Sequence, residues 1–245
     1  MVPEIQGGTM IFEKEDLTEE KLKAYSRRGV YVIPDKMTPD YLSRFGFKPD
    51  VVIDVGVSNG SDFLYSLFPA TKTVLVDPLP DFEAKIKTKF GNKYDFDFYH
   101  CAAGREPGHA TLRIQSDNAS KSTLANPTRM QGQNTGSEVT VDVRTLDSIS
   151  EKYSGAIGLK IDTEGFEMEV LGGAVETLKR TEFVLAEVSI KERYIGGYRF
   201  SDVVLFMRDN GFEILDMLNP VWRVHMFWDC LFVKKDSPLF ASRAI

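Results

Sequence analysis

Acidic residues lie near glycines at the ends of two apolar segments, where carboxylates and backbone amides can bind a ligand. Asp54 lies in VVIDVGVSNGSD, residues 51–62, and is followed by Gly56 and Gly60. Glycine has no β-carbon, so both residues allow positive φ and a close approach of the backbone to a ligand. Asp77 ends the next apolar segment, 23 residues after Asp54. An acid there is placed to hydrogen-bond the ribose hydroxyls of a nucleoside cofactor.

The predicted cofactor site includes neighbours of these residues in the glycine turn, next to Asp77 and at the end of a third strand-like segment. The full set is Asp54, Gly56, Ser58, Asn59, Gly60, Asp77, Pro78 and Ala102. In open α/β sheets, ligands bind outside the carboxyl ends of the strands, at the point where the strand order reverses. We therefore expect these residues to meet at one edge of a sheet.

Each feature also has a purely structural explanation. The two glycines are typical of a tight turn without a ligand, and Asp77 before Pro78 is a common way to start a turn. The order of strand, glycine turn and acid favours the ligand site.

Dinucleotide dehydrogenases share this order, but their G-x-G-x-x-G fingerprint has a middle glycine that residues 56–60 lack. A Rossmann-type oxidoreductase is therefore an alternative.

A second group of charged residues lies in LKIDTEGFEMEVLGGA, residues 159–174. Lys160, Asp162, Glu164 and Glu167 fall where an apolar strand-like segment ends and a helical pattern begins. This is the edge of the sheet at which the predicted cofactor site lies. The structural alternative is that Asp162 and Glu164 only cap the next helix, because acids are favoured at the positive end of its dipole.

The elements that would position these residues follow a regular alternation of strands and helices. Apolar segments predict seven core strands, at 51–55, 73–76, 94–102, 156–161, 183–188, 212–215 and 228–233. Helical patterns lie at 167–178 and 201–210, and residues 82–90 lie between helix and turn signals. The alternation predicts an α/β fold with a Rossmann-like, doubly wound seven-stranded sheet whose last strand is antiparallel.

Two regions fall outside this alternation. Residues 16–28 and 38–46 predict two short helices, so we expect a tail and a small N-terminal helical cap in residues 1–48, followed by the main domain in residues 49–245. Residues 116–136 are rich in Ser, Asn, Gln, Thr and Gly and are flanked by strand-like segments at 110–114 and 139–143. We predict a hairpin insertion that bears a mobile loop, and hypothesise that this loop covers the site when ligands bind.

Composition excludes several classes of protein. A formal net charge of −6 over 245 residues does not favour a phosphate-tracking surface or attraction to anionic lipid, so nucleic acid is not an expected partner. The two cysteines lack the spacing of a zinc site and indicate a reducing compartment. No apolar stretch reaches the roughly 20 residues of a membrane span, and the first residues lack a signal-peptide pattern. We expect a cytoplasmic protein.

The segment K-I-D-x-E-G-x-E followed by V-L-x-G resembles the signature of the FkbM family of S-adenosylmethionine-dependent methyltransferases. IDVGVSNG is similar to that family's first motif, and VDPLPDFEAKI, CAAGREPGHATL, VRTLDSI and LAEVS also match. These matches cover roughly residues 50–235, so the resemblance does not rest on one short motif. The chain has Asp77-Pro78 where family members usually have Glu-Pro, which gives the carboxylate a shorter reach.

The resemblance implies a class I methyltransferase that transfers a methyl group from S-adenosylmethionine to a hydroxyl of a sugar, glycan or related natural product. Asp162, Glu164 and Glu187 are then the candidate catalytic residues. One of them removes the hydroxyl proton, or two hold a divalent cation such as magnesium that lowers the pKa of the hydroxyl. A catalytically silent binding domain would keep the glycine turn and lose these acids, so their presence favours the enzyme.

Overall fold

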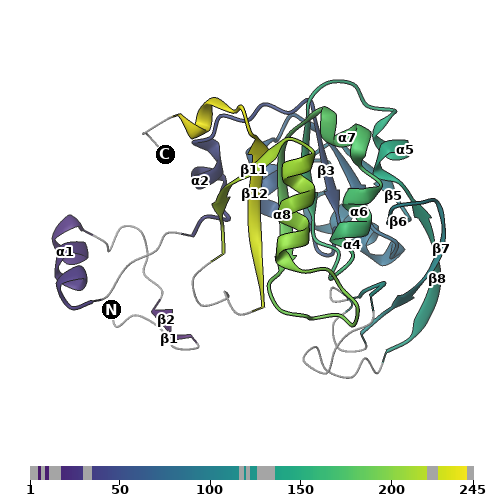
Figure 1. Ribbon diagram of the computed structural model, residues 1–245, viewed down its shortest axis with the longest axis horizontal. Helices are drawn as coiled ribbons and strands as arrows, with labels where there is room; N and C mark the ends of the chain where they lie inside the picture. Colours follow the sequence, from purple (N-terminus) through teal and green to yellow (C-terminus); the bar gives the residue numbers. More distant parts are fainter. Residues whose placement is uncertain are drawn as a thin grey trace.

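The computed structural model describes residues 5–6, 9–10, 18–29, 35–115, 119, 122–125, 136–219 and 226–241. Its centre is a seven-stranded sheet in the order β11-β12-β10-β9-β3-β4-β5, with helices on both faces (Figure 1). The strands are β3 (Val51–Val55), β4 (Lys72–Val76), β5 (Phe96–Tyr99), β9 (Ile157–Ile161), β10 (Thr181–Ser189), β11 (Phe212–Met217) and β12 (Phe227–Lys234). β12 runs antiparallel to both of its neighbours. Each strand overlaps a predicted one, which confirms the doubly wound sheet and its antiparallel last strand.

The central strands are buried on both faces, which is why their sequences are almost continuously apolar. All five residues of β3 and all five of β9 are buried, including one charged residue in each strand, Asp54 and Lys160. β3 pairs with β9 in parallel, with Asp54 opposite Lys160. The two charges therefore lie side by side in the middle of the sheet.

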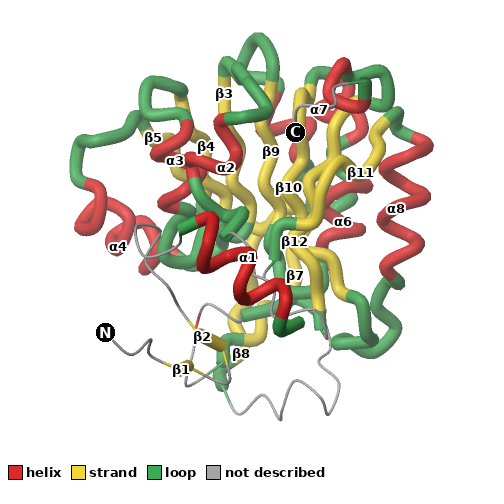
Figure 2. The backbone as a smooth tube through the Cα atoms, turned by 90° about the vertical axis from the view of Figure 1, so that its left-hand side faces the viewer, coloured by secondary structure: helices red, strands yellow, loops and turns green. Residues whose placement is uncertain are grey.

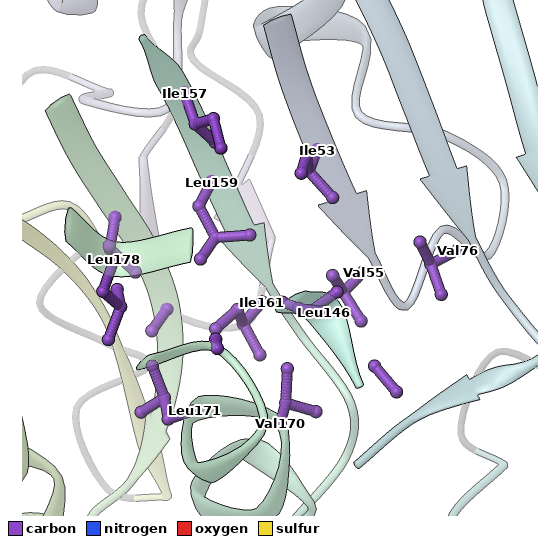
Figure 3. Close-up of a cluster of buried hydrophobic side chains, with 14 of the residues drawn as sticks. Ile53, Val55, Val76, Leu146, Ile157, Leu159, Ile161, Val170, Leu171 and Leu178 are labelled. Atoms are coloured by element: carbon purple, nitrogen blue, oxygen red, sulfur yellow. The ribbon is translucent and has the colours of Figure 1, made fainter. Parts of the chain in front are cut away.

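Side chains that alternate along the strands divide the core into two layers. One layer packs Val52, Leu75 and Leu185 against α2 (Pro39–Ser43), α3 (Asp62–Leu67) and α4 (Pro80–Phe90). The other packs the strands against four helices, namely α5 (Leu146–Ser150), α6 (Glu167–Gly172), α7 (Val175–Lys179) and α8 (Phe200–Asp209). Figure 2 shows the two sets of helices on opposite sides of the strands. Figure 3 shows Val170 and Leu171 of α6 close to Ile161 of β9.

The single helix predicted at 167–178 is wrong, because the structure has two helices separated near Gly173. A Cβ at Gly173 would overlap the carbonyl oxygen of Gly104. The chain breaks the helix here because a neighbouring loop packs directly on its backbone, and only glycine leaves room for that contact.

The strand predicted at 94–102 is also two elements. β5 ends at Tyr99, and the Cys101 amide donates to the Tyr99 carbonyl at 2.9 Å, so the chain turns before β6 (Ala102–Ala103). β6 joins β7 (Gly108–Arg113) and β8 (Glu138–Arg144) in a small sheet of order β6-β8-β7. β7 and β8 pair antiparallel from Gly108 to Arg113, which confirms the predicted hairpin insertion.

The N-terminal region is only partly a cap. α1 (Glu19–Arg27) has no buried residue, whereas α2 and the residues after it contribute Leu42 and Phe45 to the core. Residues of the expected tail form a short antiparallel pair, β1 (Ile5–Gln6) and β2 (Thr9–Met10). The division at residue 48 stays a prediction.

At the other end of the described chain, a 3-10 helix, Pro238–Phe240, follows β12. Within the described residues, none of the helices is both long and apolar enough to cross a bilayer.

Candidate functional site

A cavity of about 300 Å³ lies at the carboxyl ends of β3, β4, β9 and β10. Eight of the predicted site residues line it: Gly56, Ser58, Asp77, Pro78, Ala102, Asp162, Glu164 and Glu187. The three other predicted cofactor residues, Asp54, Asn59 and Gly60, are not among the lining residues. The fold therefore places the two groups of acids, which are far apart in the sequence, at one cavity.

The glycine turn after β3 is shaped by packing as well as by the cavity. Gly56 has φ of 79°, and a Cβ there would overlap the carbonyl oxygen of Asp162. Gly60 has φ of 88°, and a Cβ there would lie 2.7 Å from the Ile86 side chain. Ser58 also adopts a positive φ, 49°, which is uncommon for a residue with a side chain. The turn is thus packed between Asp162, which follows β9, and α4, and Gly56 and Ser58 remain on the cavity wall.

Asp77 fixes the same turn through its carboxylate. The amides of Val57 and Ser58 donate to Oδ2 at 3.1 and 3.3 Å, and the amide of Leu79 donates to Oδ1 at 3.0 Å. Burial raises the pKa of Asp77 to about 6, although these three amides act in the opposite direction. Each carboxylate oxygen can accept two hydrogen bonds, so Asp77 retains capacity toward a ligand hydroxyl in the cavity that it lines.

Asp54 belongs to a buried polar group behind the cavity wall. It is fully buried, accepts a hydrogen bond from the Tyr65 hydroxyl at 2.6 Å, and lies 3.2 Å from the Lys160 ammonium. Burial acts to lower the pKa of Lys160, but the carboxylates of Asp54 and Asp162 outweigh it and raise that pKa. Lys160 is therefore charged, and it links Asp54 to Asp162, whose Oδ2 is 3.5 Å from the ammonium.

The three predicted catalytic carboxylates form one cluster. Asp162 follows β9, Glu164 lies in the turn before α6, and Glu187 lies in β10. Each residue has one carboxylate oxygen in the cluster, and these three oxygens all lie within 4.8 Å of one another. We call Asp162, Glu164 and Glu187 the carboxylate cluster. The oxygens are close enough together for a proton, a cationic side chain or a single metal ion to bridge them.

Arg193, which we did not predict, pairs with two members of the cluster. Its Nη1 donates to Glu187 Oε1 at 2.7 Å, and its Nη2 pairs with Glu164 Oε2. The Tyr194 hydroxyl donates to the same oxygen of Glu164 at 2.9 Å. Burial raises the pKa of Glu187 well above its ordinary value, and Asp162 and Glu164 add to the effect. Burial also raises the pKa of Glu164, and Arg193 opposes that shift.

Glu167 builds the turn that presents Glu164. Its Oε1 accepts from the amides of Thr163 and Gly165, each at 3.0 Å, and its Oε2 accepts from the Tyr198 hydroxyl at 2.6 Å. Glu164 itself has φ of 51°, a left-handed conformation that costs about 1 kcal/mol or more for a non-glycine residue. The surrounding contacts hold this strained residue at the cavity wall.

The sequence patterns did not indicate a role for Arg193, Tyr194 or Tyr198. The Tyr194 hydroxyl binds Glu164, and the Tyr198 hydroxyl binds Glu167. All three residues lie in the segment between β10 and α8, which has no periodic pattern. The one available signal was the need of several buried carboxylates for a cation.

Comparisons with known proteins identify the family to which the chain belongs. Residues 54–214 match the family model described as the methyltransferase FkbM domain. A relative, 2-O-methyltransferase NoeI from Sinorhizobium fredii (strain NBRC 101917 / NGR234), is 29% identical over 165 residues, which cover 61% of this chain and 68% of that protein.

Among solved structures, the methyltransferase FkbM from Methylobacillus flagellatus is 16% identical, with a TM-score of 0.45, over 80% of this chain and 50% of that one. Magnesium protoporphyrin IX methyltransferase from Synechocystis, with bound S-adenosylmethionine, is 12% identical, with a TM-score of 0.46, over 80% of this chain and 76% of that one. The family model, which matches about two thirds of the residues, shows that this chain belongs to the FkbM family of S-adenosylmethionine-dependent methyltransferases.

Proposed function

We propose that the chain transfers the methyl group of S-adenosylmethionine to a hydroxyl group of a sugar, glycan or related natural product. The observation that carries the proposal is the single cavity that joins the glycine turn and Asp77 to the carboxylate cluster. A small-molecule or glycan acceptor, rather than nucleic acid, fits a chain with a formal net charge of −6.

The cavity fits the cofactor in three ways. Its apolar wall includes Val76, Phe82 and Leu112, which offer a surface for an adenine ring. Asp77 offers an acceptor for ribose hydroxyls. The carboxylate cluster offers negative charge to the sulfonium and ammonium groups. When bound, the cofactor supplies a methyl group that is activated for displacement.

Asp162 is the member of the cluster best suited to act as the base. Its side chain is 34% exposed, against 16% for Glu164 and 10% for Glu187, and Arg193 pairs with the other two. In the proposed step, the acceptor oxygen bonds to the methyl carbon as the carbon–sulfur bond breaks. The electron pair of that bond stays on sulfur, and the hydroxyl proton passes to Asp162. Glu164 and Glu187, which pair with Arg193, keep the charges around Asp162 in fixed positions.

A divalent cation such as magnesium is the alternative to a direct base. The carboxylate cluster has suitable oxygen ligands, and a bound cation would lower the pKa of the acceptor hydroxyl. Arg193 favours the direct base, because it already supplies positive charge to two of the three carboxylates. Activity of the purified enzyme after EDTA treatment, and again after adding magnesium, separates the two mechanisms.

The activity of the relative guides the choice of acceptor. That protein is a 2-O-methyltransferase, so the first acceptors to test are glycosides with a free 2-hydroxyl, each paired with its 2-deoxy form. We expect mass spectrometry to show a gain of one methyl group on the hydroxylated member of a pair and none on the 2-deoxy member. Methylation of nitrogen or carbon acceptors, with none on hydroxyls, would contradict the proposal.

Calorimetry tests the other classes of function. We expect S-adenosylmethionine to bind and a nicotinamide dinucleotide not to bind. Tight binding of the dinucleotide without a response to S-adenosylmethionine would favour the Rossmann-type oxidoreductase. Binding of the methyl donor without turnover on any acceptor class would favour a silent binding domain.

A further inference from the structure

Arg193 lies behind the carboxylate cluster rather than in the cavity. Its side chain is 6% exposed, and it is absent from the residues that line the cavity, whereas all three carboxylates line it. One guanidinium nitrogen binds Glu187 of β10, and another binds Glu164 of the turn before α6. A single residue therefore connects two separate elements at the reactive end of the cavity.

Aromatic rings fix the orientation of this guanidinium. Its central carbon lies 5.0 Å from the Phe227 ring and 5.4 Å from the Tyr194 ring, distances at which cation–π attraction acts. Tyr194 also donates its hydroxyl to Glu164. Since a guanidinium is planar, always charged and weakly hydrated, it can remain in this buried position as a fixed cation.

A fixed cation relieves the repulsion within the cluster. Three carboxylates with oxygens within 4.8 Å of one another repel each other, and the repulsion is strong where water is largely excluded. Lys160 lies 3.5 Å from Asp162 on one side. Glu164 and Glu187, which are the more buried members, have Arg193.

We propose that Arg193 is a positioning residue that acts as the internal counter-cation of the carboxylate cluster, holding Glu164 and Glu187 as bound carboxylates and leaving Asp162 to accept the proton. The assignment of Asp162 rests on the proposed function, whereas the counter-cation role does not.

The geometry of the cluster has a consequence for variants that lack the charge of Arg193. Oxygens up to 4.8 Å apart can bind one Ca²⁺, which takes carboxylate ligands at about 2.3–2.6 Å. Removal of the guanidinium should therefore create a divalent-cation site.

The main test compares Arg193→Gln with wild type, first without any acceptor. Thermal unfolding is measured in EDTA and in millimolar CaCl₂ or MgCl₂. We expect the variant to unfold at a lower temperature in EDTA and to recover stability with Ca²⁺, and the wild type to respond little. Arg193→Lys keeps one charge but cannot bind both carboxylates, so we expect a weaker response than that of Arg193→Gln.

A matched control is Arg180→Gln. Arg180 also links separate segments, but it donates to the backbone carbonyls of Ser150, Tyr153 and Gly155 instead of carboxylates. We expect this variant to lose stability equally in EDTA and in Ca²⁺. If Arg193→Gln behaves in the same way, or if it is as stable as the wild type in EDTA, the counter-cation role is wrong.

Turnover tests the positioning role separately. With an acceptor in hand, we expect Arg193→Gln to lower kcat by about tenfold or more while KM changes by less than about threefold, and Ca²⁺ to restore part of kcat. An unchanged kcat, or a fall in kcat matched by an equal loss of folded protein, would contradict positioning. If the wild type itself shows no hydroxyl methylation, the proposed function fails, but the cation response of the unfolding curve still decides the role of Arg193.

Discussion

Asp77 and the carboxylate cluster line the same cavity, but their charges are stabilised by different groups. Asp77 accepts hydrogen bonds from three backbone amides, and all three belong to the turns that follow β3 and β4. Glu164 and Glu187 rely on the cationic side chain of Arg193, 29 and 6 residues away in the chain. Amides around Asp77 suit a carboxylate that binds a neutral hydroxyl, whereas crowded carboxylates suit cationic groups and proton transfer. The predictions below test this division, from the largest expected effect to the smallest.

Removal of the charge of Asp162 should have the largest effect. Asp162→Asn keeps the shape of the side chain, and we expect kcat to fall by about 10²- to 10⁴-fold, the usual contribution of a general base. Affinity for S-adenosylmethionine should fall much less, by no more than about tenfold or roughly 1.4 kcal/mol, because Glu164 and Glu187 of the cluster are unchanged. Single-turnover assays and calorimetry measure the two quantities.

Two further variants control for this result. Glu169→Gln alters an exposed acid of α6 that pairs with Arg105, and it should leave kcat unchanged. Glu164→Gln alters a carboxylate that Arg193 already holds. If turnover survives both Asp162→Asn and Glu164→Gln within about threefold, a barrier change below roughly 0.7 kcal/mol, the cluster is structural and the base lies elsewhere.

Truncation of Asp77 should affect the cofactor rather than the chemical step. We expect Asp77→Ala to weaken S-adenosylmethionine binding by about 1.5–3 kcal/mol, because charge-assisted hydrogen bonds are lost. Asp77→Asn keeps an oxygen that can accept the amides of the glycine turn, so it should retain more of the fold. Equal cofactor affinity in wild type and both variants would show that Asp77 only shapes the turn.

The pH dependence of cofactor binding should identify the charge state of Asp77. Burial raises its pKa to about 6, and the ionised carboxylate is the better hydrogen-bond acceptor. We therefore expect cofactor affinity to rise by about tenfold from pH 5 to pH 7.5 in the wild type, and less in Asp77→Asn. Calorimetry at several pH values makes the comparison, and parallel curves for the two proteins would assign the titration to other groups.

Protein stability should change in the opposite direction with pH. The folded pKa of Asp77 lies above its ordinary value of 3.8, so the folded state binds the extra proton between these two values. The free energy of unfolding of the wild type should therefore fall, relative to that of Asp77→Asn, as pH rises from about 4 to above 6. Denaturant titrations over this pH range measure the free energy of unfolding. A rise of this free energy with pH, relative to Asp77→Asn, would contradict the raised pKa of Asp77.

The smallest expected effect concerns the insertion between β7 and β8. Most of residues 116–136, the proposed lid, lie outside the described residues, but Ser122 and Leu124 line the cavity and the Thr123 hydroxyl donates to the Glu164 carbonyl at 2.6 Å. We expect hydrogen exchange in this segment to slow on adding cofactor. Thr123→Val should reduce that slowing, since one hydrogen bond contributes about 1 kcal/mol. Identical exchange with and without cofactor would argue against a ligand-responsive lid.

Sequence patterns predicted most of the fold because the relevant signals are local. The apolar segments at 51–55 and 156–161 correspond to β3 and β9 within one residue, since strands covered on both faces must be continuously apolar. The two errors arose from contacts between distant residues. The helix at 167–178 is broken by the approach of Gly104, and the strand at 94–102 turns so that β6 can join β8. Neither partner is visible from the local sequence.

The same division applies to the site. The sequence alone determined that acids lie near or just after the carboxyl ends of several strands. Parallel strands present these ends at one edge of the sheet, which is why Asp77, Asp162 and Glu187 meet at the cavity. Only the tertiary structure decided what each carboxylate binds: backbone amides for Asp77, Tyr65 and Lys160 for Asp54, and Arg193 for Glu164 and Glu187. The periodicity of a strand fixes its position and the face of each side chain. The charge that a buried acid requires can come from any segment that folds against it, so long-range packing selects the partner.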